Sequence, residues 1–137
     1  MASNAKPHGE LSAGAVGELA GVTGNTIGQW ARWGYIRASQ SAGDPHVYSV
    51  EDVAEASIVS ELLERGVRHR DVRRAIAHLG EYGDWPLSEA PLATTPEGRL
   101  LLLKENGDIY ALSARGWQLM TAPPEIKDVR LRLRRVR

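Results

Sequence analysis

The stretch from Leu11 to Tyr48 constrains the fold of this chain more than any other. It contains a short apolar helix, a glycine-centred turn, a second short helix and a turn-rich segment, which follow one another directly: LSAGAVGELAGVTGNTIGQWARWGYIRASQSAGDPHVY. This order predicts a helix-turn-helix followed by a wing, an arrangement that presents one helix to a DNA groove. The alternative is two ordinary helices of an all-α core, and the turn residues in the position of a wing favour the first interpretation.

Capping residues predict the limits of four helices. We expect helices over 13–20 and 24–33, ended by Gly21 and Gly34, with Thr23 as the cap of the second. Ser49, with Asp52 three residues on, predicts a capping box and a third helix to about residue 65; a fourth follows over about 70–79. The positions expected to face the core are Val16, Leu19, Ala20, Ile27, Trp30, Ala31, Val50, Val53, Ile58, Leu62, Leu63, Val72, Ala75, Ile76 and Leu79.

The remainder of the chain predicts a connection and a small β unit. Residues 81–98 are rich in Gly and Pro, and Asn106-Gly107 between two apolar runs is a strong hairpin signal, with 117–120 as a further strand. The expected fold class is therefore α+β, with a disordered end at 1–9, a winged helix-turn-helix at 10–80 and an antiparallel β unit at 99–137. Residues 100–103 are all leucine, so one face of that strand is expected to pack on the helices and the other on a second subunit. Residues 127–137 alternate apolar and basic side chains, which fits either an edge strand or a DNA-binding tail.

The amino-acid composition excludes several kinds of functional site and several classes of protein. The absence of cysteine excludes disulfides and thiolate metal sites. The four histidines are scattered and no nucleophile motif is present, so we expect no enzyme, no catalytic or metal-binding residue and no cofactor. No apolar run reaches membrane-spanning length and residues 1–9 lack the apolar core of a signal peptide, so we expect a cytoplasmic, nucleoid-associated protein.

The charge balance limits how this chain can bind DNA. Its 17 basic and 17 acidic residues give a net charge of zero, whereas nucleic-acid binding usually draws on a basic surface. We therefore expect a local positive face and a homodimer, or tandem copies on double-stranded DNA. The basic residues near the start of the fourth helix fit either phosphate contacts or a solvated face: Arg68, Arg70, Arg73 and Arg74.

Three motifs resemble the MerR superfamily, in its excisionase-like and short-regulator branch. The segment 26–36 (TIGQWARWGYI) is similar to its second helix, 46–53 (HVYSVEDV) to its wing exit and third-helix start, and 64–72 (ERGVRHRDV) to the joint before its fourth helix. The resemblance covers about residues 11–80. It implies a sequence-specific transcriptional regulator, a repressor in our interpretation, with the helix 24–33 in the major groove.

Carried over to this sequence, the resemblance also implies the DNA contacts. The expected contact residues are Thr23, Asn25, Thr26, Gln29, Arg32, Arg37, His46 and Tyr48. Asn and Gln can read adenine, while Arg can read guanine or pair with phosphate. Gly28 stands where many members have a phosphate-binding arginine, and the wing carries few basic residues, which together predict weaker or salt-sensitive binding.

Two alternative functions remain open. The segment 54–118 resembles antitoxins that carry a MerR-like DNA-binding domain and are paired with PIN-like toxins, which implies a toxin protein as partner and autoregulation of an operon. MerR regulators usually dimerise through a long helix after the fourth one. Such a helix is not expected in this chain, because Pro86, Pro91 and Pro96 interrupt the segment where it would lie. An excisionase-like architectural protein that bends DNA is the second alternative.

Overall fold

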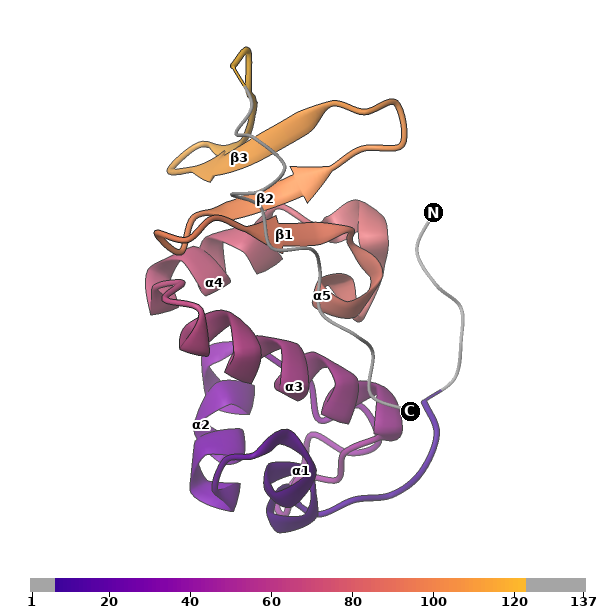
Figure 1. Ribbon diagram of the computed structural model, residues 1–137. Coiled ribbons are helices and arrows are strands. Elements are labelled where there is room, and N and C mark those ends of the chain that lie inside the picture. Colours follow the sequence, from indigo (N-terminus) through magenta and orange to yellow (C-terminus); the bar gives the residue numbers. More distant parts are fainter. Residues whose placement is uncertain (1–6, 123–137) are drawn as a thin grey trace.

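The structure, a computed structural model, describes residues 7–122. Figure 1 shows the sheet stacked on the helices, with α1 and α2 at the end of the molecule farthest from the sheet. The predicted α+β class is confirmed; the predicted tail at 127–137 lies outside the described residues. The elements are α1 (Ala13–Ala20), α2 (Gly24–Trp33), α3 (Val50–Glu64), α4 (His69–Ala77), η1 (Gly80–Tyr82), α5 (Pro86–Glu89), β1 (Leu92–Thr94), β2 (Leu100–Leu103), β3 (Ile109–Ser113) and β4 (Gly116–Leu119).

A side-chain cap and two left-handed glycines set the limits of the helix-turn-helix. Thr23 Oγ1 accepts a hydrogen bond from the Thr26 amide at 3.1 Å, which satisfies one free amide at the start of α2. Gly21 and Gly34 follow α1 and α2 with φ of 80° and 81°, a region that glycine adopts without the steric cost of a Cβ. The predicted limits of both helices are confirmed.

The two helices are held together at Gly17. A Cβ built at this position would lie 2.5 Å from the carbonyl oxygen of Val22 and 2.9 Å from the carbonyl carbon of Thr23, both backbone atoms that cannot move alone. Gly17 is buried, so the turn between α1 and α2 packs directly on the α1 backbone. Glycine is therefore required here by the close approach of two backbones.

We expect Gly17→Ala to lower the free energy of unfolding by about 1–3 kcal/mol, because the added methyl overpacks the α1–turn contact. Gly28→Ala is the matched control, since its Cβ would meet only the flexible end of Arg32 at 3.4 Å. That helical glycine substitution is expected to be neutral or to stabilise by up to about 1 kcal/mol. Urea unfolding of the two variants measures both values, and equal stabilities would contradict the close approach.

The wing is shorter than its sequence predicts. Between Tyr35 and Tyr48 the only strand-like pairing is one antiparallel bridge, Ser41 with Val47. The other strand-like contact of the wing joins Tyr48 to Leu11, with both backbone hydrogen bonds at 2.8 Å. The base of the wing thus pairs with the segment before α1 instead of extending its own hairpin.

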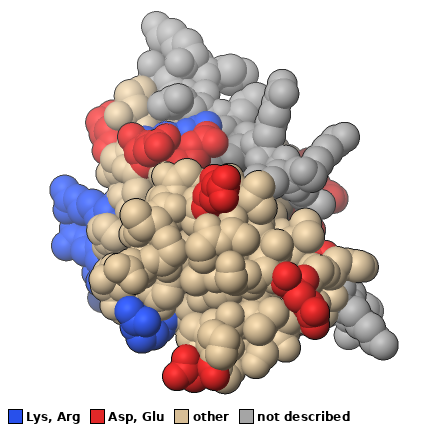
Figure 2. All heavy atoms as spheres, turned by 90° about the horizontal axis from the view of Figure 1, so that it is seen from below, with Lys and Arg blue, Asp and Glu red and all other residues tan. Residues whose placement is uncertain are grey.

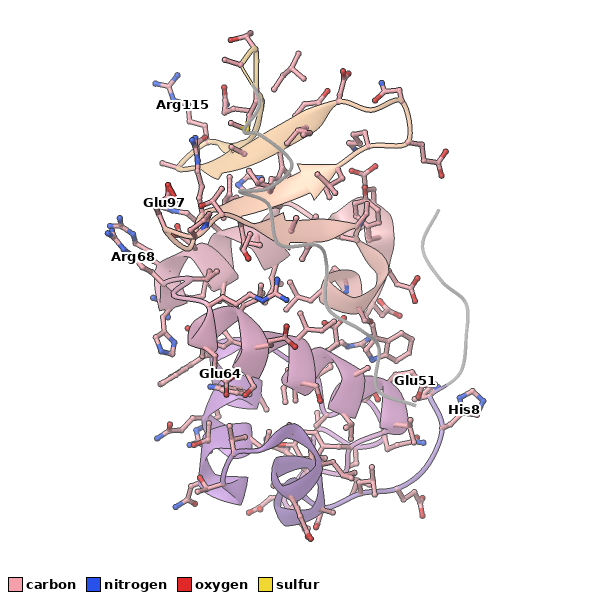
Figure 3. All side chains as sticks on the ribbon, viewed as in Figure 1. His8, Glu51, Glu64, Arg68, Glu97 and Arg115 are labelled. Carbon is pink, nitrogen blue, oxygen red and sulfur yellow. The ribbon has the colours of Figure 1, made fainter. Side chains whose placement is uncertain are left out.

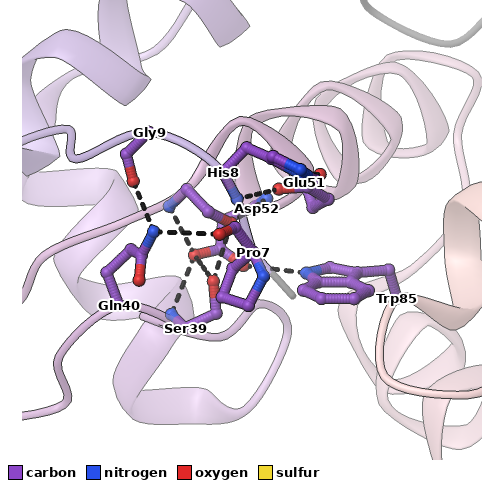
Figure 4. A network of polar contacts seen from close by, with 9 residues as sticks. Pro7, His8, Gly9, Ser39, Gln40, Glu51, Asp52 and Trp85 are labelled. Carbon is purple, nitrogen blue, oxygen red and sulfur yellow. Dashed lines mark hydrogen bonds and ion pairs between the residues drawn. The ribbon is translucent and has the colours of Figure 1, made fainter. Parts of the chain in front are cut away.

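Residues 7–9 are fastened to the wing and to α3, although a disordered end is predicted there (Figure 4). Gln40 Nε2 donates to the carbonyl oxygens of Pro7 and Gly9, at 3.2 and 2.7 Å. The His8 ring lies 2.7 Å from a carboxylate oxygen of Glu51. A glutamine in the wing was not expected to serve this purpose, and no local pattern in the sequence signals it.

Helix α3 is the centre of the helical layer. The predicted capping box is confirmed: the Ser49 and Asp52 side chains each bond the other residue's backbone amide, at 3.2 and 2.9 Å. Two expected core positions are wrong, since Val50 is 44% and Leu19 is 60% exposed. Val50 lies in the first turn of α3, and Leu19 lies roughly 200° around α1 from the buried Gly17.

The segment after α4 is more than a connection. The fourth helix ends at Ala77, two residues before its predicted end, and the next residues form η1, α5 and β1. Trp85 and Leu87 are buried, and the Trp85 indole donates to Asp52 Oδ1 at 3.0 Å (Figure 4). The Gly and Pro content suggested a linker, but its apolar residues anchor it to α3.

The sheet is a four-stranded antiparallel meander in the order β1-β2-β3-β4. The predicted hairpin at Asn106-Gly107 is confirmed, with Leu103 opposite Ile109, and so is the final strand. Leu100 and Leu102 face the core shared with the helices, while Leu101 belongs to a second cluster. Leu101 is 0% exposed in the structure. The packing of this face on a second subunit stays a prediction.

One hydrophobic core joins the two layers. It runs from Val16 and Ile27 in the helix-turn-helix, through Leu62 of α3, to Leu100 and Leu112 in the sheet. The sheet therefore supports the same core that holds α2 in place.

Candidate nucleic-acid interface

Helix α2 presents a polar face to solvent. Asn25, Gln29 and Arg32 are exposed, as the sequence predicts for residues that contact DNA. The opposite face is fixed by Ile27 and Trp30, which are 0% and 3% exposed. The helix is therefore held by one apolar side while the other remains available to a ligand as large as a duplex.

The threonines at the start of α2 are partly engaged within the protein. Thr23 is exposed and Thr26 is half-buried, and their hydroxyl oxygens lie 3.0 Å apart. The Thr23 hydroxyl also caps the helix. This pair fixes the first turn of α2, and the Thr26 side chain has less freedom to reach a base edge than Asn25.

The guanidinium of Arg32 lies over Gly28. Its Nη1 would be 3.4 Å from a Cβ at position 28, so the absence of a side chain there leaves room for the arginine of the next turn. Burial raises the pKa of the Tyr48 phenol, the charge of Asp52 raises it further, and the nearby positive charge of Arg32 opposes both. The charge of Arg32 is therefore close enough to act on the base of the wing.

A hollow of about 490 Å³ separates the wing from the start of α1. Its lining includes Ser12, Gly28, His46 and Tyr48, so it joins α1, α2 and the wing. The ring Nδ1 of His46 and the phenol oxygen of Tyr48 are buried without a hydrogen-bond partner in the described part of the chain. Unsatisfied buried polar atoms are costly, so these two side chains are held at the base of the wing at the expense of hydrogen bonds.

Tyr48 is not the exposed contact residue that the sequence predicts. Its side chain is 0% exposed and its ring packs edge-on against His46, with 6.1 Å between ring centroids. Its contact with the DNA backbone stays a prediction, and in this structure His46 lies between the Tyr48 ring and the half-exposed side of the wing. This burial could not be predicted from the residue type, because tyrosine occurs both on surfaces and in cores.

Arg37 lies apart from the other expected contact residues. Its guanidinium pairs with Asp84 at 3.2 Å and lies 6.0 Å from the centre of the Trp85 ring. It lines a different hollow from His46 and Tyr48, next to α5. The structure therefore brings together α2 and the wing but leaves Arg37 on the side of the β unit.

Two basic residues near the start of α4, Arg68 and Arg73, lie beyond the end of α2. Exposed Trp33 packs edge-on against His69 of α4, and Arg73 Nη1 donates to the Tyr35 phenol at 3.3 Å. Figure 3 shows Arg68 at the same margin, projecting into solvent. From the sequence, these arginines could either contact phosphate or form a solvated helix face. The sequence did not show that they lie beyond the end of α2.

The charge of the α1–α2 end is mixed. Figure 2 shows this end as mainly uncharged atoms, with Lys and Arg gathered at one margin and acidic groups spread over the face. Between residues 7 and 122, no three His, Asp or Glu side chains are grouped so that they could hold a metal ion. Within the same range, no helix has the length and apolar character to cross a membrane.

Comparison with known proteins agrees with this geometry. Residues 11–79, which hold α1 to α4 and the wing, match the MerR HTH family regulatory proteins. Uncharacterised HTH-type transcriptional regulators of Mycobacterium tuberculosis and Mycobacterium bovis are 30% identical over 112 residues, which cover 72% of this chain and 50% of each relative. The chain thus spans about half the length of the curated relatives it matches. No solved structure matches it significantly.

The matched segment contains the capped helix pair, the wing and the α3–α4 joint, and it makes up half of the chain. The chain therefore belongs to the MerR family of helix-turn-helix regulatory proteins.

Proposed function

We propose that this protein is a sequence-specific DNA-binding transcriptional regulator that reads the major groove with α2. The observation that carries this proposal is the exposed polar row of Asn25, Gln29 and Arg32 on a helix anchored by Ile27 and Trp30. Amide and guanidinium groups match the hydrogen-bonding patterns of adenine and guanine in that groove. The relatives' names, HTH-type transcriptional regulators, support the same role.

The wing contributes a contact to the DNA backbone. A phosphate at the mouth of the hollow between wing and α1 would meet the start of α1, capped by Ser12, and the half-buried His46. Helix N-termini favour anions. Arg32, which occupies the space over Gly28, supplies the charge that many family members place at position 28. Tyr48 supports His46 from behind.

Affinity comes from more than one copy. With zero net charge and few basic residues on the α1–α2 end, each copy neutralises few phosphates. We propose that a homodimer or tandem copies bind neighbouring half-sites in the cytoplasm. Selection of bound sites from random duplex DNA, at stated salt, tests this: inverted half-sites indicate a two-fold dimer and direct half-sites indicate tandem copies. Recovery of no preferred sequence would contradict specific reading.

The direction of regulation is repression in this proposal. A protein that occupies a promoter with the compact domain described here blocks polymerase by overlap. In vitro transcription from a template carrying the selected site is expected to fall as protein is added. A rise would assign activation instead.

We expect Arg32→Ala to weaken specific binding by about 1–3 kcal/mol, because it removes a charged group from the face that meets the groove. The matched control is Arg115→Ala. Arg115 is also exposed but lies at the sheet end of the molecule, opposite α1 and α2 (Figure 3). Fluorescence anisotropy with the selected duplex measures both variants. Equal affinities of the two variants for the duplex would show that Arg32 does not contribute to DNA binding.

The antitoxin and the excisionase-like alternatives stay predictions. Co-expression with the small protein encoded by the neighbouring gene tests the first, because a stable complex that silences a nuclease is its defining property. Circular-permutation gels test the second, because an architectural protein bends its site strongly.

A further inference from the structure

The outer face of the sheet, which is turned away from the helices, carries a small apolar cluster. The strand register sets Ala93, Leu101 and Ala111 side by side across β1, β2 and β3. These three side chains are 0–1% exposed and belong to a cluster separate from the core that the sheet shares with the helices. In residues 7–122, the apolar side chains that pack against them come from the sheet and the residue after it: Leu103, Ile109 and Met120.

The sheet cannot bury this face by itself. Side chains stand roughly perpendicular to a sheet, so neighbours on the same face flank a side chain without covering its end. Leu101 lies between two alanines, and a single methyl group on either side is too short to shield a leucine. The 0% exposure of Leu101 in a single copy of the chain therefore requires a further layer on this face. Because the helices pack on the opposite face, that layer comes from outside residues 7–122.

The segment 127–137 has the sequence pattern that such a layer needs. From Val129 to Arg134 it reads VRLRLR, so an extended backbone would carry three apolar side chains on one side and three arginines on the other. Residues 1–6 contain only one large apolar side chain, Met1, and they precede a segment that is fastened to the wing and to α3. The C-terminal segment is therefore the better match for an apolar face.

Distance and charge favour the same segment. The last strand, β4, forms one edge of the sheet, and the seven residues from Ala122 to Val129 reach up to about 23 Å, whereas β4 and β2 are roughly 10 Å apart. Residues 7–122 carry 15 acidic and 10 basic side chains, a net charge of −5 with histidine neutral. Residues 123–137 carry two acidic and six basic side chains, a net charge of +4. The segment is therefore attracted to the rest of its own chain.

We propose that residues 127–137 dock on the outer face of the sheet, with the apolar side of the segment on Leu101 and its two alanine neighbours and the arginines turned to solvent. The docked segment closes this face to a second copy and keeps its arginines at the end of the molecule opposite α2 (Figure 1). Copies that bind neighbouring half-sites then meet through another surface. The docking does not depend on DNA binding, so it stands or falls separately from the regulatory role proposed above.

A spin label tests the docking, because the chain has no cysteine and a single introduced cysteine is the only residue labelled. Arg132→Cys puts the label on the solvent side of the docked segment in the full chain. In an isotope-labelled sample of this variant without DNA, the amide signals of Ala93, Leu101 and Ala111 should lose most of their intensity to paramagnetic broadening. The amide signal of Asn25, at the far end of the molecule, should keep its intensity. Full intensity at the three sheet amides would overturn the proposal.

A mixed sample identifies the copy that supplies the segment. Isotope-labelled chains without a spin label are mixed with spin-labelled chains of natural isotope abundance, so that only broadening between copies is observed. We expect no broadening of the sheet amides in this sample. Broadening there would assign the face to another copy and would contradict docking within one chain.

Two matched variants test which side of the segment docks. Leu131→Ser combined with Leu133→Ser removes two apolar side chains and should abolish the broadening of the sheet amides. Arg130→Ser combined with Arg134→Ser changes the opposite side and should preserve it. Loss in the arginine variant with retention in the leucine variant would contradict the proposed orientation. The broadening should also persist when duplex DNA is added, whereas transfer of the segment to the duplex would make it a DNA-binding tail and refute the docking.

Discussion

Replacement of Asp52 by alanine is expected to lower the free energy of unfolding by about 3–5 kcal/mol, the cost of breaking a buried, fully bonded charged group. Asp52 is 0% exposed. Its Oδ2 accepts hydrogen bonds from the Ser39 amide at 2.8 Å, the Ser39 hydroxyl at 2.7 Å and the Ser49 amide at 2.9 Å. Its Oδ1 accepts the Trp85 indole at 3.0 Å.

Each of these donors belongs to a different part of the fold. Ser39 leads into the wing, Ser49 begins α3, and Trp85 holds the segment before the sheet (Figure 4). Loss of the carboxylate therefore removes the acceptor of four donor groups, on Ser39, Ser49 and Trp85, and releases the wing base and the α5 segment together. We expect the variant to lose DNA binding as well, because the wing is no longer fixed to α3.

Two comparisons make the experiment decisive. Asp52→Asn keeps the volume and one acceptor oxygen, so its loss of stability should fall between the wild type and alanine. Glu64→Ala removes an exposed carboxylate from the far end of the same helix, and its effect should stay within about 0.5 kcal/mol. Urea denaturation measures all three; a change below about 1 kcal/mol for Asp52→Ala would show that the network contributes little.

The second large effect is on the pH dependence of stability. Burial raises the pKa of Glu55 from 4.5 to about 8, so between these values the folded protein holds a proton that the unfolded chain has released. The stabilising contribution is complete below pH 4.5 and is lost as pH rises towards 8. We expect the free energy of unfolding to fall by about 2–3 kcal/mol from pH 5.5 to pH 8.5.

Glu55→Gln isolates this effect because glutamine has the same shape and does not ionise. Its stability should be nearly constant over that pH range and should exceed that of the wild type at pH 8.5. Burial tends to raise the pKa of the Glu51 carboxyl, but the hydrogen bonds from His8 outweigh it and lower that pKa below its usual value. A wild-type slope that survives in Glu55→Gln would place the titrating group elsewhere.

Local chemistry in the sequence was sufficient for the helices. Thr23, Gly21 and Gly34 predict the limits of α1 and α2 because caps and left-handed turns depend on neighbouring residues alone. Leu19 and Val50 were assigned to the core because periodicity shows that a helix is amphipathic but not which neighbour covers each position. Gly17, not Leu19, faces the next helix, and that choice depends on how closely two backbones approach.

Long-range contacts were beyond the reach of sequence patterns. Asp52 was recognised only as a helix cap, yet its second oxygen binds Trp85, 33 residues away. The same limit applies to the candidate site. The exposure of Asn25, Gln29 and Arg32 follows from helical spacing, whereas the burial of Tyr48 and the pairing of Arg37 with Asp84 depend on where the wing and the α5 segment pack.

The central claim is that side chains on α2 read bases, and a change of specificity tests it most directly. Gln29 is exposed in the middle of α2, where a glutamine prefers adenine and a lysine prefers guanine. Site selection from random DNA should therefore be repeated with Gln29→Lys at the same salt concentration. We expect the preferred base to change from adenine to guanine at one position of each half-site, with all other positions unchanged. Identical preferences for the two proteins would contradict base reading by α2.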